Sequence, residues 1–561
     1  MDYQSQLASI LFTLRHGAHC GRLPDWDEDI ARQVLTEAAR FTAAEIDPLD
    51  GLTEQAPPRL EQGRVVLPAH MVDAYRAYRD AGWPTLAGTE EYGGQHLPHV
   101  LASAVSEMLA GASLSFQMLI GLTAGAIRVI TSSGTPQQRA AYLPPLVSGE
   151  WLATMCLTEP QAGSDLGQTR TAARARPDGD YLLSGGKIFI SGGDQNLTDN
   201  IVHLVLARTA GAPAGVKGLS LFLAPAVLPD GRRNAITCLR LEEKMGLHGS
   251  PTCQLAFDDA EAQMLGGEGE GLARMFEMMN AARIEVGVQG VGLAEVAAQR
   301  SRAYAAERRQ GRGADGNGPV PLHRHADVRR MLLTQMALVE GCRALVYRTD
   351  VEQELGANQP LVDFLTPVCK AFASDSAVEA AQLAIQIHGG YGYLKEYRME
   401  QILRDARITQ IYEGANGIQA ITLADRLLRM AGGAPMQAFA REIDDAIEGG
   451  PAEARTALLE ARDHWERASA ALLRGASAGA VANQYLRLTG LLAVGAAWAR
   501  LEEAAGHAPQ PARTRAAARY YREAMLPECG YLAQRVIQGT DVGGLFGRGI
   551  RRVSAIGHAL I

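Results

Sequence analysis

The sequence predicts a mostly helical α+β protein in which a β-rich module separates two helical regions. Apolar residues recur at helical spacing before residue 150, and short β-rich runs separated by turn residues fill 151–258. Long helical patterns return after about residue 270. The chain has 561 residues, of which 47% are hydrophobic and 21% charged, and this is ample material for several domains with buried cores.

The N-terminal region predicts several helices joined by loops. A helical pattern ends before Asp47-Pro48, and 47–70 is expected to be a loop because it is rich in proline, glycine and charged residues. A second stretch rich in glycine and proline covers 82–98. The predicted helices are 26–46, 70–81 and, as two buried helices, 99–132.

The middle of the chain predicts a small antiparallel barrel or sandwich, because short strands alternate with turn signals. Pro177-Asp178-Gly179 and Ser184-Gly185-Gly186 are two of these turns. The predicted strands are Trp151–Leu157, Tyr181–Ser184, Lys187–Ser191, Ile201–Ala207, Leu219–Ala224 and Gln254–Phe257.

The last part of the chain is again helical, with a Gly/Ala/Pro junction at 431–435. The tail carries mixed charge on its polar faces, so we expect it to pack on the main body or at a subunit interface rather than on a membrane. Gly539–Arg552 is expected to be a flexible terminal segment. The predicted helices are 270–310, 325–356, 361–388, 417–431, Ala452–Leu473, Ala478–Ala505 and Ala512–Gln538, the last interrupted at Pro527.

Charge and cysteine content limit the possible partners and compartments. A net charge of −8 and a pI of about 6.0 give no general attraction to nucleic acid or acidic lipid. Seven cysteines without a C-x-x-C pair predict neither a disulfide framework nor a zinc site. The N-terminus has no basic n-region, and no uninterrupted apolar run reaches about 18–20 residues. We therefore expect a cytoplasmic protein without membrane association.

One carboxylate, Glu413, lies in a turn between apolar residues and a glycine, in Ile411-Tyr412-Glu413-Gly414. Desolvation at such a position disfavours the charged form and raises the pKa of the carboxyl toward the range useful for proton abstraction. The alternative is a solvated residue in a helix-to-helix turn, because Gly414 and Asn416-Gly417 are breakers. The local spacing alone favours this alternative.

Two segments of the β-rich module end in small polar residues. Cys156–Asp165 follows a strand and opens into a Gly/Ser loop, whose amides and hydroxyls can bind a polar ring edge, although an ordinary strand exit has the same pattern. Lys187–Gly193 joins an apolar strand to a serine and two glycines, which allow the backbone to approach a flat ligand. Neither segment has the G-x-G-x-x-G or Walker spacing, so a nucleotide cofactor here requires another binding geometry.

Six segments in order resemble the acyl-CoA dehydrogenase family of flavoproteins: Met155–Ser164, Lys187–Gly193, Asn280–Arg283, Glu307-Arg308, Gln386–Gly392 and Ile411–Gly414. The resemblance spans about 30–430. The N-terminal extension and the tail are similar to the long bacterial subgroup that includes 3-methylmercaptopropionyl-CoA dehydrogenase-like enzymes. The implied segments are an extension (1–35), an N-terminal helical domain (36–150), a middle β-barrel domain (151–270), a C-terminal four-helix bundle (271–430) and an additional helical domain (431–561).

The resemblance implies an FAD-dependent acyl-CoA dehydrogenase of fatty acid β-oxidation, an oxidoreductase that forms a trans-2-enoyl-CoA. Glu413 would remove the α-proton, hydride would pass to flavin N5, and an electron-transferring flavoprotein would accept the electrons. Some relatives carry the base on the earlier helix, at the position of Ala282, which has no acid-base capacity. Glu285 lies two residues beyond Arg283 and is expected to point to a different face.

The resemblance also assigns binding residues. The Glu413 amide and Gly414 would polarise the thioester carbonyl. Ala415 replaces a usual threonine, which removes about 0.5–1.5 kcal/mol of hydrogen bonding near the flavin. The implied FAD contacts are Met155, Cys156, Leu157, Thr158, Ser164, Phe189, Ile190, Ser191, Arg308, Gln386, Gly389, Gly390, Ala415 and Asn416, and the implied substrate contacts are Ser164, Asn280, Arg283 and Gly414.

Several implications carry alternatives. Arg308, Gln386, Gly389 and Gly390 would reach the FAD of a neighbouring subunit, which implies a homodimer or a dimer of dimers, but Arg308 and Gln386 are also ordinary surface residues by pattern. An acyl-CoA oxidase, or a dehydrogenase of carrier-protein thioesters in a biosynthetic pathway, would have the same motifs. A flavin-containing DNA-binding relative belongs to another class, and the acidic charge and Glu413 argue against it.

The sequence does not identify the acyl chain. We expect the walls of the acyl pocket near 112–125, where Phe116 and Met118 suggest a short pocket. Ordinary helix core remains the stronger interpretation of both residues.

Overall fold

The computed structural model describes residues 3–314 and 316–539, and the chain divides into two compact units. The long helices α10 (Ala326–Leu355) and α11 (Gln359–His388) contribute residues to both units. The predicted flexible segment Gly539–Arg552 falls almost entirely outside the described residues. The first unit comprises Met1–Leu11, Cys20–Val339 and Ser374–Glu413, and the second comprises Phe12–His19, Glu340–Ala373 and Gly414–Ile561.

The N-terminal part of the first unit is helical, as predicted. A side-chain cap begins α2, because Asp27 accepts hydrogen bonds from the Asp29 and Ile30 amides at 2.8 and 2.9 Å. The helices are α1 (Leu7–Phe12), α2 (Glu28–Phe41), α3 (Asp47–Gln55), α4 (Ala69–Asp80), α5 (His99–Ala112), α6 (Leu114–Ile120), α7 (Leu122–Ser133) and α8 (Pro136–Val147).

The prediction of a loop over 47–70 is wrong. Helix α3 begins at Asp47, and Pro48 lies in its first turn, where a missing N–H group costs no hydrogen bond. The strands β1 (Arg59–Glu61) and β2 (Arg64–Val66) then form a hairpin. Gln62 and Gly63 make its two-residue turn, both with positive φ, at 50° and 77°.

The region 99–132 forms three helices rather than the predicted two. Ser113 is extended and its hydroxyl caps α6, and Gly121 separates α6 from α7. The segment Leu114–Ser133 is long and apolar enough to cross a membrane by composition, with a mean hydropathy of 1.5. The segment comprises α6 and α7, and 61% of its most apolar stretch is buried inside the structure.

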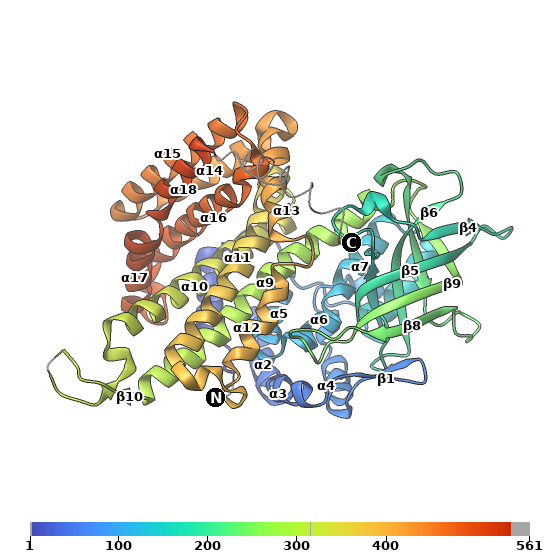
Figure 1. The fold of residues 1–561 in the computed structure, drawn as a ribbon, viewed down its shortest axis with the longest axis horizontal. Helices are drawn as coiled ribbons and strands as arrows, with labels where there is room; N and C mark the ends of the chain where they lie inside the picture. Colours follow the sequence, from blue (N-terminus) through green and yellow to red (C-terminus); the bar gives the residue numbers. More distant parts are fainter. Residues whose placement is uncertain (1–2, 315, 540–561) are drawn as a thin grey trace, which may run out of the picture. The chain divides into compact units, whose positions relative to one another are not determined.

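The β-rich region forms a seven-stranded sheet that closes on itself, so the predicted barrel is confirmed (Figure 1). Strand order follows β3–β6–β4–β5–β9–β7, and β7 pairs again with β6. The strands are β3 (Trp151–Cys156), β4 (Ala172–Ala175), β5 (Tyr181–Ser191), β6 (Asn200–Thr209), β7 (Leu219–Pro225), β8 (Ile236–Leu241) and β9 (Thr252–Leu265).

The barrel differs from its prediction in two respects. Strand β6 pairs in parallel with β3 and β4, so the sheet is mixed rather than antiparallel. The two predicted runs Tyr181–Ser184 and Lys187–Ser191 are a single strand, β5. Gly185 lies inside this strand rather than in a turn. Only glycine fits there, because a Cβ would lie 2.8 Å from the Thr171 Cα.

Helix α9 (Gly271–Glu307) connects the barrel to the helices of the first unit. It packs against α5, α7, β7 and α12 (Met399–Thr409). The stretch that leads to Glu413 is carried by α12, so α9 and α12 together position the predicted base.

The tail helices pack in the second unit against the parts of α10 and α11 that belong to it. Phe439 stacks on Phe364 at 5.0 Å, and Glu442 binds Arg348 and Arg500 at 3.2 and 2.7 Å. Pro527 interrupts the last predicted helix, as expected. The helices are α13 (Asn416–Ile421), α14 (Ala434–Gly449), α15 (Ala452–Leu473), α16 (Ala478–Glu503), α17 (Pro511–Tyr520) and α18 (Glu528–Gln538), of which α14–α18 are orange to red in Figure 1.

Candidate active site

Glu413 lies in a tight turn directly after α12. Its φ of 53° is left-handed, which is uncommon for a residue with a long side chain, and Gly414 follows with a φ of 87°. The amides of Ile411 and Tyr412 still bond to the Ile408 carbonyl, at 2.8 and 3.1 Å, so the helix end holds the turn in place. The Glu413 side chain is half-buried. Such backbone strain at a carboxylate is typical of functional sites.

Arg283 of α9 holds the backbone of this turn. Its Nε donates to the Glu413 carbonyl oxygen at 3.4 Å, and its Nη1 donates to Asn280 Oδ1 at 2.9 Å. The guanidinium also lies 5.8 Å from the centre of the Phe276 ring. Two of the predicted substrate residues thus lie together beside the predicted base.

Tyr412 links the turn to a chain of buried amides. Its hydroxyl donates to Gln289 Oε1 at 2.5 Å, and Gln289 Nε2 donates to Gln117 Oε1 at 2.7 Å. Gln117 Nε2 donates in turn to the carboxylate of Glu285. Burial raises the pKa of Tyr412 well above its ordinary value, and the nearby Glu413 and Glu285 carboxylates raise it further.

Glu285 contacts a different set of partners from Arg283, which agrees with its expected offset along α9. Its carboxylate accepts hydrogen bonds from Ser106 of α5 and Gln117 of α6, whereas Arg283 faces the Glu413 turn. Ala282 supplies no acid-base group on this helix. Glu413 and Glu285 occupy different environments, joined through Tyr412.

A buried ion pair holds the two β segments together. Glu159 and Lys187 are 3% and 0% exposed, and their charged atoms are 2.8 Å apart. Burial by itself would raise the pKa of the Glu159 carboxyl, but the Lys187 ammonium and hydrogen bonds from Thr171 and the Arg170 amide lower it to about 2. The pair fixes the loop that follows β3 against β5.

The predicted flavin residues on these segments include accessible groups. Phe189 has a φ of 61° and is 61% exposed, because β5 shifts register against β9 between Lys187 and Ile190 and turns the ring outward. Thr158 and Ser191 are half-buried, and Ser164 is exposed. No Cβ at Gly163 would meet an atom within 4 Å, so a flat ligand can approach this backbone closely.

The remaining predicted flavin residues of this region contribute differently. The Cys156 thiol is fully buried beside Thr154 and His203, and burial raises its pKa to about 12. Leu157 and Ile190 are also buried, whereas Met155 is half-buried. At Cys156 a ligand therefore meets the backbone rather than the thiol.

Asp405 fixes α12 to a loop of the barrel region. It accepts a hydrogen bond from the Leu247 amide at 2.6 Å and is 4% exposed. Burial and the neighbouring Asp50 carboxyl raise the pKa of Asp405 to about 8. Gly246 allows this contact, because a Cβ there would lie 2.5 Å from Asp405 Oδ1.

Three of the four residues predicted to reach the FAD of a neighbouring subunit line one cavity of about 440 Å³. Arg308 is half-buried, and its guanidinium lies 5.5 Å from the centre of the Tyr391 ring. Gly389 and Gly390 form the same wall, and neither would bring a Cβ within 4 Å of another atom. A cation and open glycine backbone are suited to an anionic group. Gln386 is exposed on α11 and is not among the described residues that line this cavity.

The predicted residues after Glu413 belong to the second unit. Asn416 Oδ1 accepts from Lys370 Nζ at 2.7 Å, and its Nδ2 donates to the Ala371 carbonyl at 3.3 Å. The Ala415 carbonyl accepts from the Ile418 and Gln419 amides as α13 begins. The Asn416 amide thus anchors the start of α13.

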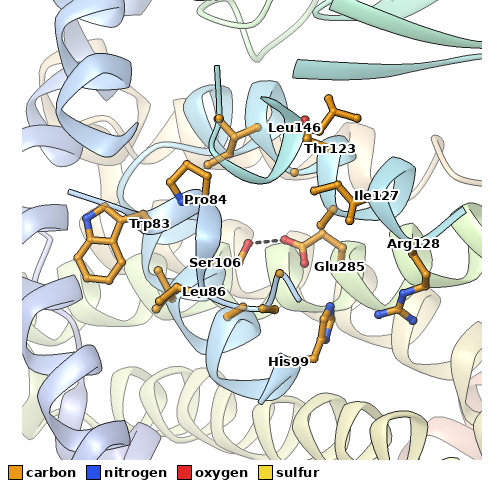
Figure 2. A pocket seen from close by; sticks show the side chains of 18 of the residues that line it. Trp83, Pro84, Leu86, His99, Ser106, Thr123, Ile127, Arg128, Leu146 and Glu285 are labelled. Carbon is orange, nitrogen blue, oxygen red and sulfur yellow. Dashed lines mark hydrogen bonds between the residues drawn. The ribbon is translucent and has the colours of Figure 1, made fainter. Parts of the chain in front are cut away.

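A second cavity, of about 450 Å³, lies between α4, α5, α7 and α9 (Figure 2). Its wall is mostly apolar, with Leu86, Ile127 and Leu146 among its residues. Glu285 and Ser106 supply polar atoms, and Figure 2 shows the hydrogen bond between them. The lining includes Ile120–Gly121 and Thr123–Ala124, inside the predicted 112–125 region. Phe116 and Met118 are buried and are not among the described lining residues, which agrees with their interpretation as core.

Sequence reasoning missed Glu159, Lys187, Gln117, Gln289 and Asp405. A lysine in the otherwise apolar run Lys187–Ile190 is a usable signal, because buried lysines are rare unless paired. The glutamines gave no signal, since single amides on helices are ordinary surface residues. Their role depends on the elements that meet in the fold.

Comparisons with known proteins agree over nearly the whole chain. Residues 28–150, 154–260 and 269–428 match the N-terminal, middle and C-terminal domains of acyl-CoA dehydrogenase. Residues 434–542 match the acetyl-CoA dehydrogenase C-terminal like domain. The chain is 41% identical to 3-methylmercaptopropionyl-CoA dehydrogenase of Ruegeria pomeroyi over 530 residues, covering 88% of this chain and 90% of that protein.

Two solved structures share the fold along most of the chain. Caenorhabditis elegans ACDH-11 in complex with C11-CoA superposes with a TM-score of 0.80 at 21% identity, covering 94% of this chain and 93% of that one. An acyl-CoA dehydrogenase from Bacillus anthracis complexed with FAD has a TM-score of 0.74 at 23% identity, with coverages of 92% and 88%.

Proposed function

The chain belongs to the acyl-CoA dehydrogenase family and is an FAD-dependent acyl-CoA dehydrogenase, and we propose that Glu413 is the base that removes the α-proton of the acyl thioester. The observation that supports this role is the strained turn, in which a half-buried carboxylate follows α12 and Arg283 holds its backbone. Ala282 cannot act as a base on α9.

In this proposal the chain's own residues bind and orient the reactants. Bound FAD supplies the acceptor for the hydride that leaves the β-carbon. The exposed Phe189 ring and the Thr158 and Ser191 hydroxyls fit the face and polar edge of a flat cofactor. Ser164 and Asn280 contact the substrate. The backbone at Glu413 and Gly414, with the Glu413 amide as hydrogen-bond donor, stabilises the charge that develops on the thioester oxygen.

Arg308, Gly389 and Gly390 are proposed to bind the FAD pyrophosphate of a neighbouring subunit. The cavity they line combines a guanidinium with open glycine backbone, which suits a diphosphate. This role requires a homodimer or a dimer of dimers. Gln386 is proposed to reach the same FAD, from its exposed position one turn earlier on α11.

The proposed electron acceptor is an electron-transferring flavoprotein, and the proposed compartment is the cytoplasm, where thiols remain reduced. All seven cysteines are buried free thiols. Oxygen consumption by the substrate-reduced enzyme distinguishes an oxidase from this dehydrogenase.

Glu413→Gln tests the base. The substitution keeps the size and polarity of the side chain but removes its basicity, so we expect the rate of anaerobic flavin bleaching to fall by about 10²–10⁴-fold. FAD content, measured by absorbance after release, should stay at the wild-type level. Bleaching is measured with a set of acyl-CoA substrates that have short, long, branched and thioether chains. The thioether is included because the Ruegeria pomeroyi relative is a 3-methylmercaptopropionyl-CoA dehydrogenase.

Glu396→Gln is the matched control, since Glu396 is an exposed carboxylate that precedes α12. Its bleaching rate should equal that of the wild type. Retention of wild-type bleaching by Glu413→Gln would show that another group is the base.

Arg308→Ala tests the pyrophosphate site. Removal of the cation should lower the FAD retained after gel filtration at moderate salt, and sedimentation velocity will show whether the dimer weakens with it. Arg309→Ala is the control, because Arg309 is exposed and its Nε donates to the Pro319 carbonyl at 3.1 Å. Equal FAD content in the two variants would remove Arg308 from the site.

A further inference from the structure

The cavity between α4, α5, α7 and α9 is large, mostly apolar and separate from the candidate base. It has a volume of about 450 Å³, enough for several carbon atoms of a chain. Neither Glu413 nor Tyr412 is among the described residues that line it. An apolar cavity of this kind, close to the proposed acyl site, would accept the end of a long acyl chain unless the residues between them exclude it.

A polar cluster forms one part of the cavity wall. Glu285 Oε1 accepts hydrogen bonds from Ser106 Oγ and Gln117 Nε2, and Gln117 Nε2 also lies 3.0 Å from Ser106 Oγ. Figure 2 shows Ser106 and Glu285 facing each other in the middle of the cavity view. Burial raises the pKa of Tyr78, another lining residue, and the Glu285 charge raises it further. The Glu285 carboxylate therefore acts electrostatically on a side chain that lines the cavity.

The other side of this cluster leads to the candidate base. Gln117 Oε1 accepts from Gln289 Nε2, and Gln289 Oε1 accepts from the hydroxyl of Tyr412, the residue before Glu413. Gln117 is fully buried and Gln289 is 3% exposed. One hydrogen-bonded layer thus has Tyr412 at one end and the cavity wall at the other.

We propose that Glu285, Ser106 and Gln117 form a polar barrier that ends the acyl site short of the cavity, so that the enzyme selects short acyl thioesters. The inference rests on the proposed function, in which Glu413 acts on the acyl thioester, so that the acyl chain begins next to Glu413 and its neighbour Tyr412. We call these three residues the polar barrier.

The barrier discriminates through unsatisfied polar groups. A short acyl chain ends before the layer and leaves its hydrogen bonds intact. A longer alkyl chain must separate Gln117 from Glu285 and offers no donor in return, so a half-buried carboxylate and a fully buried amide lose partners. A site with buried polar groups rejects an apolar substituent by more than an apolar pocket rejects one extra methylene.

Removal of the carboxylate joins the acyl site to the cavity. Glu285→Ala takes away both the charge and the volume of the side chain, and the apolar lining then accepts the end of a long chain. Glu285→Gln keeps the volume and an acceptor oxygen, so it leaves most of the barrier in place. Chain-length preference should follow this order of substitutions.

The test compares butanoyl-CoA with decanoyl-CoA on FAD-loaded enzyme. For wild type and each variant we measure the rate of anaerobic flavin bleaching per unit substrate, and take the decanoyl-to-butanoyl ratio. We expect Glu285→Ala to raise this ratio by about tenfold or more over wild type. Glu285→Gln should raise it less. If the alanine variant does not yield folded holoenzyme, Glu285→Ser replaces it, and we expect the same increase in the decanoyl-to-butanoyl ratio.

The matched control is Glu277→Ala on the same helix. Glu277 also accepts a serine hydroxyl, from Ser132 at 2.5 Å, but it is not among the described residues of the cavity wall. Its ratio should equal that of wild type. A change in both variants would indicate a general effect of removing charge from α9.

A binding measurement separates failure of the barrier from failure of the proposed function. In the Glu413→Gln background, titration calorimetry with each acyl-CoA should show a gain in relative affinity for decanoyl-CoA when Glu285→Ala is added. An unchanged ratio in bleaching and in binding, or a wild type that takes both chains equally, overturns the barrier. Absence of bleaching and binding by every acyl-CoA overturns the proposed function itself.

Discussion

Two carboxyl groups beside the candidate site are buried to almost the same extent, yet their surroundings drive their pKa values in opposite directions. Glu159, on the barrel side, is 3% exposed, and its pKa is lowered to about 2. Asp405, on the helical side, is 4% exposed, and its pKa is raised to about 8. Burial alone raises both values, so the neighbours decide the direction.

The neighbours differ in charge. Glu159 has the Lys187 ammonium at 2.8 Å and accepts from Thr171. Asp405 accepts one amide hydrogen bond, while the Asp50 carboxyl nearby disfavours a second negative charge. Both residues hold elements of the site in place, Glu159 the loop after β3 and Asp405 the helix that leads to Glu413. The barrel side therefore depends on an ion pair, and the helical side on a carboxyl whose pKa is raised by burial and by Asp50.

These two environments give opposite dependences of stability on pH. The lowered pKa of Glu159 contributes stability above its ordinary value of 4.5, and this is lost as pH falls toward 2. The raised pKa of Asp405 contributes stability fully present below its ordinary value of 3.8, and this is lost as pH rises through about 8. Alkaline conditions should therefore loosen α12 before the barrel.

The largest expected effect comes from breaking the ion pair. Glu159→Gln leaves the Lys187 ammonium buried without its counter-charge, which should lower the free energy of unfolding by about 3–5 kcal/mol. Denaturant titration at pH 7, monitored by flavin release and by tryptophan fluorescence, measures this decrease in the free energy of unfolding. Adding Lys187→Met should restore much of it, because an apolar pair of similar volume is tolerated at such sites.

An exposed ion pair of the same barrel is the control. Arg174 and Asp259 are 64% and 56% exposed with charged atoms 3.2 Å apart, so Asp259→Asn should cause no measurable change in stability. If Glu159→Gln is as stable as Asp259→Asn, the buried ion pair contributes no more to stability than the exposed one, and the barrel side does not depend on it.

The smaller effect is a change in the pH dependence of stability. Asp405→Asn keeps an oxygen that can accept from the Leu247 amide but cannot ionise. We expect the thermal midpoint of the variant to gain on that of wild type as pH rises from 5 to 9, because only wild type loses stability through the raised pKa of this carboxyl. The slope from this one group is at most about 1.4 kcal/mol per pH unit. Parallel curves for variant and wild type would show that Asp405 does not titrate near pH 8.

Local patterns predicted most of the elements, and the errors have local causes. The helix at Ala452–Leu473 was placed to the residue, since amphipathic spacing and flanking breakers agree there. The loop prediction for 47–70 is wrong because a proline breaks a helix only in its interior, and Pro48 lies in the first turn of α3, where it is compatible with the helix. The prediction of two strands over 181–191 is wrong because Gly185 is a point of close packing against Thr171 inside β5 and not a turn residue.

The candidate site was predictable in part. The Glu413 turn and the neighbouring pair Asn280 and Arg283 were named from sequence, and the structure places them side by side. The role of Asn416 toward the cofactor stays a prediction, and the structure adds that its amide binds Lys370 and the Ala371 carbonyl. Side-chain partners of this kind do not follow from the order of motifs.

By itself, the sequence determined the helical and strand periodicities, the barrel between helical regions, and the position of Glu413 in a glycine-flanked turn. The tertiary structure alone decided which polar groups meet. Glu159 meets Lys187 from 28 residues away, Asp405 meets Leu247 from 158, and Glu285 meets Ser106 from 179. Periodicity reports which face of an element is buried, but the partners on that face, and hence the charge and reach of the acyl site, are set when separate elements pack together.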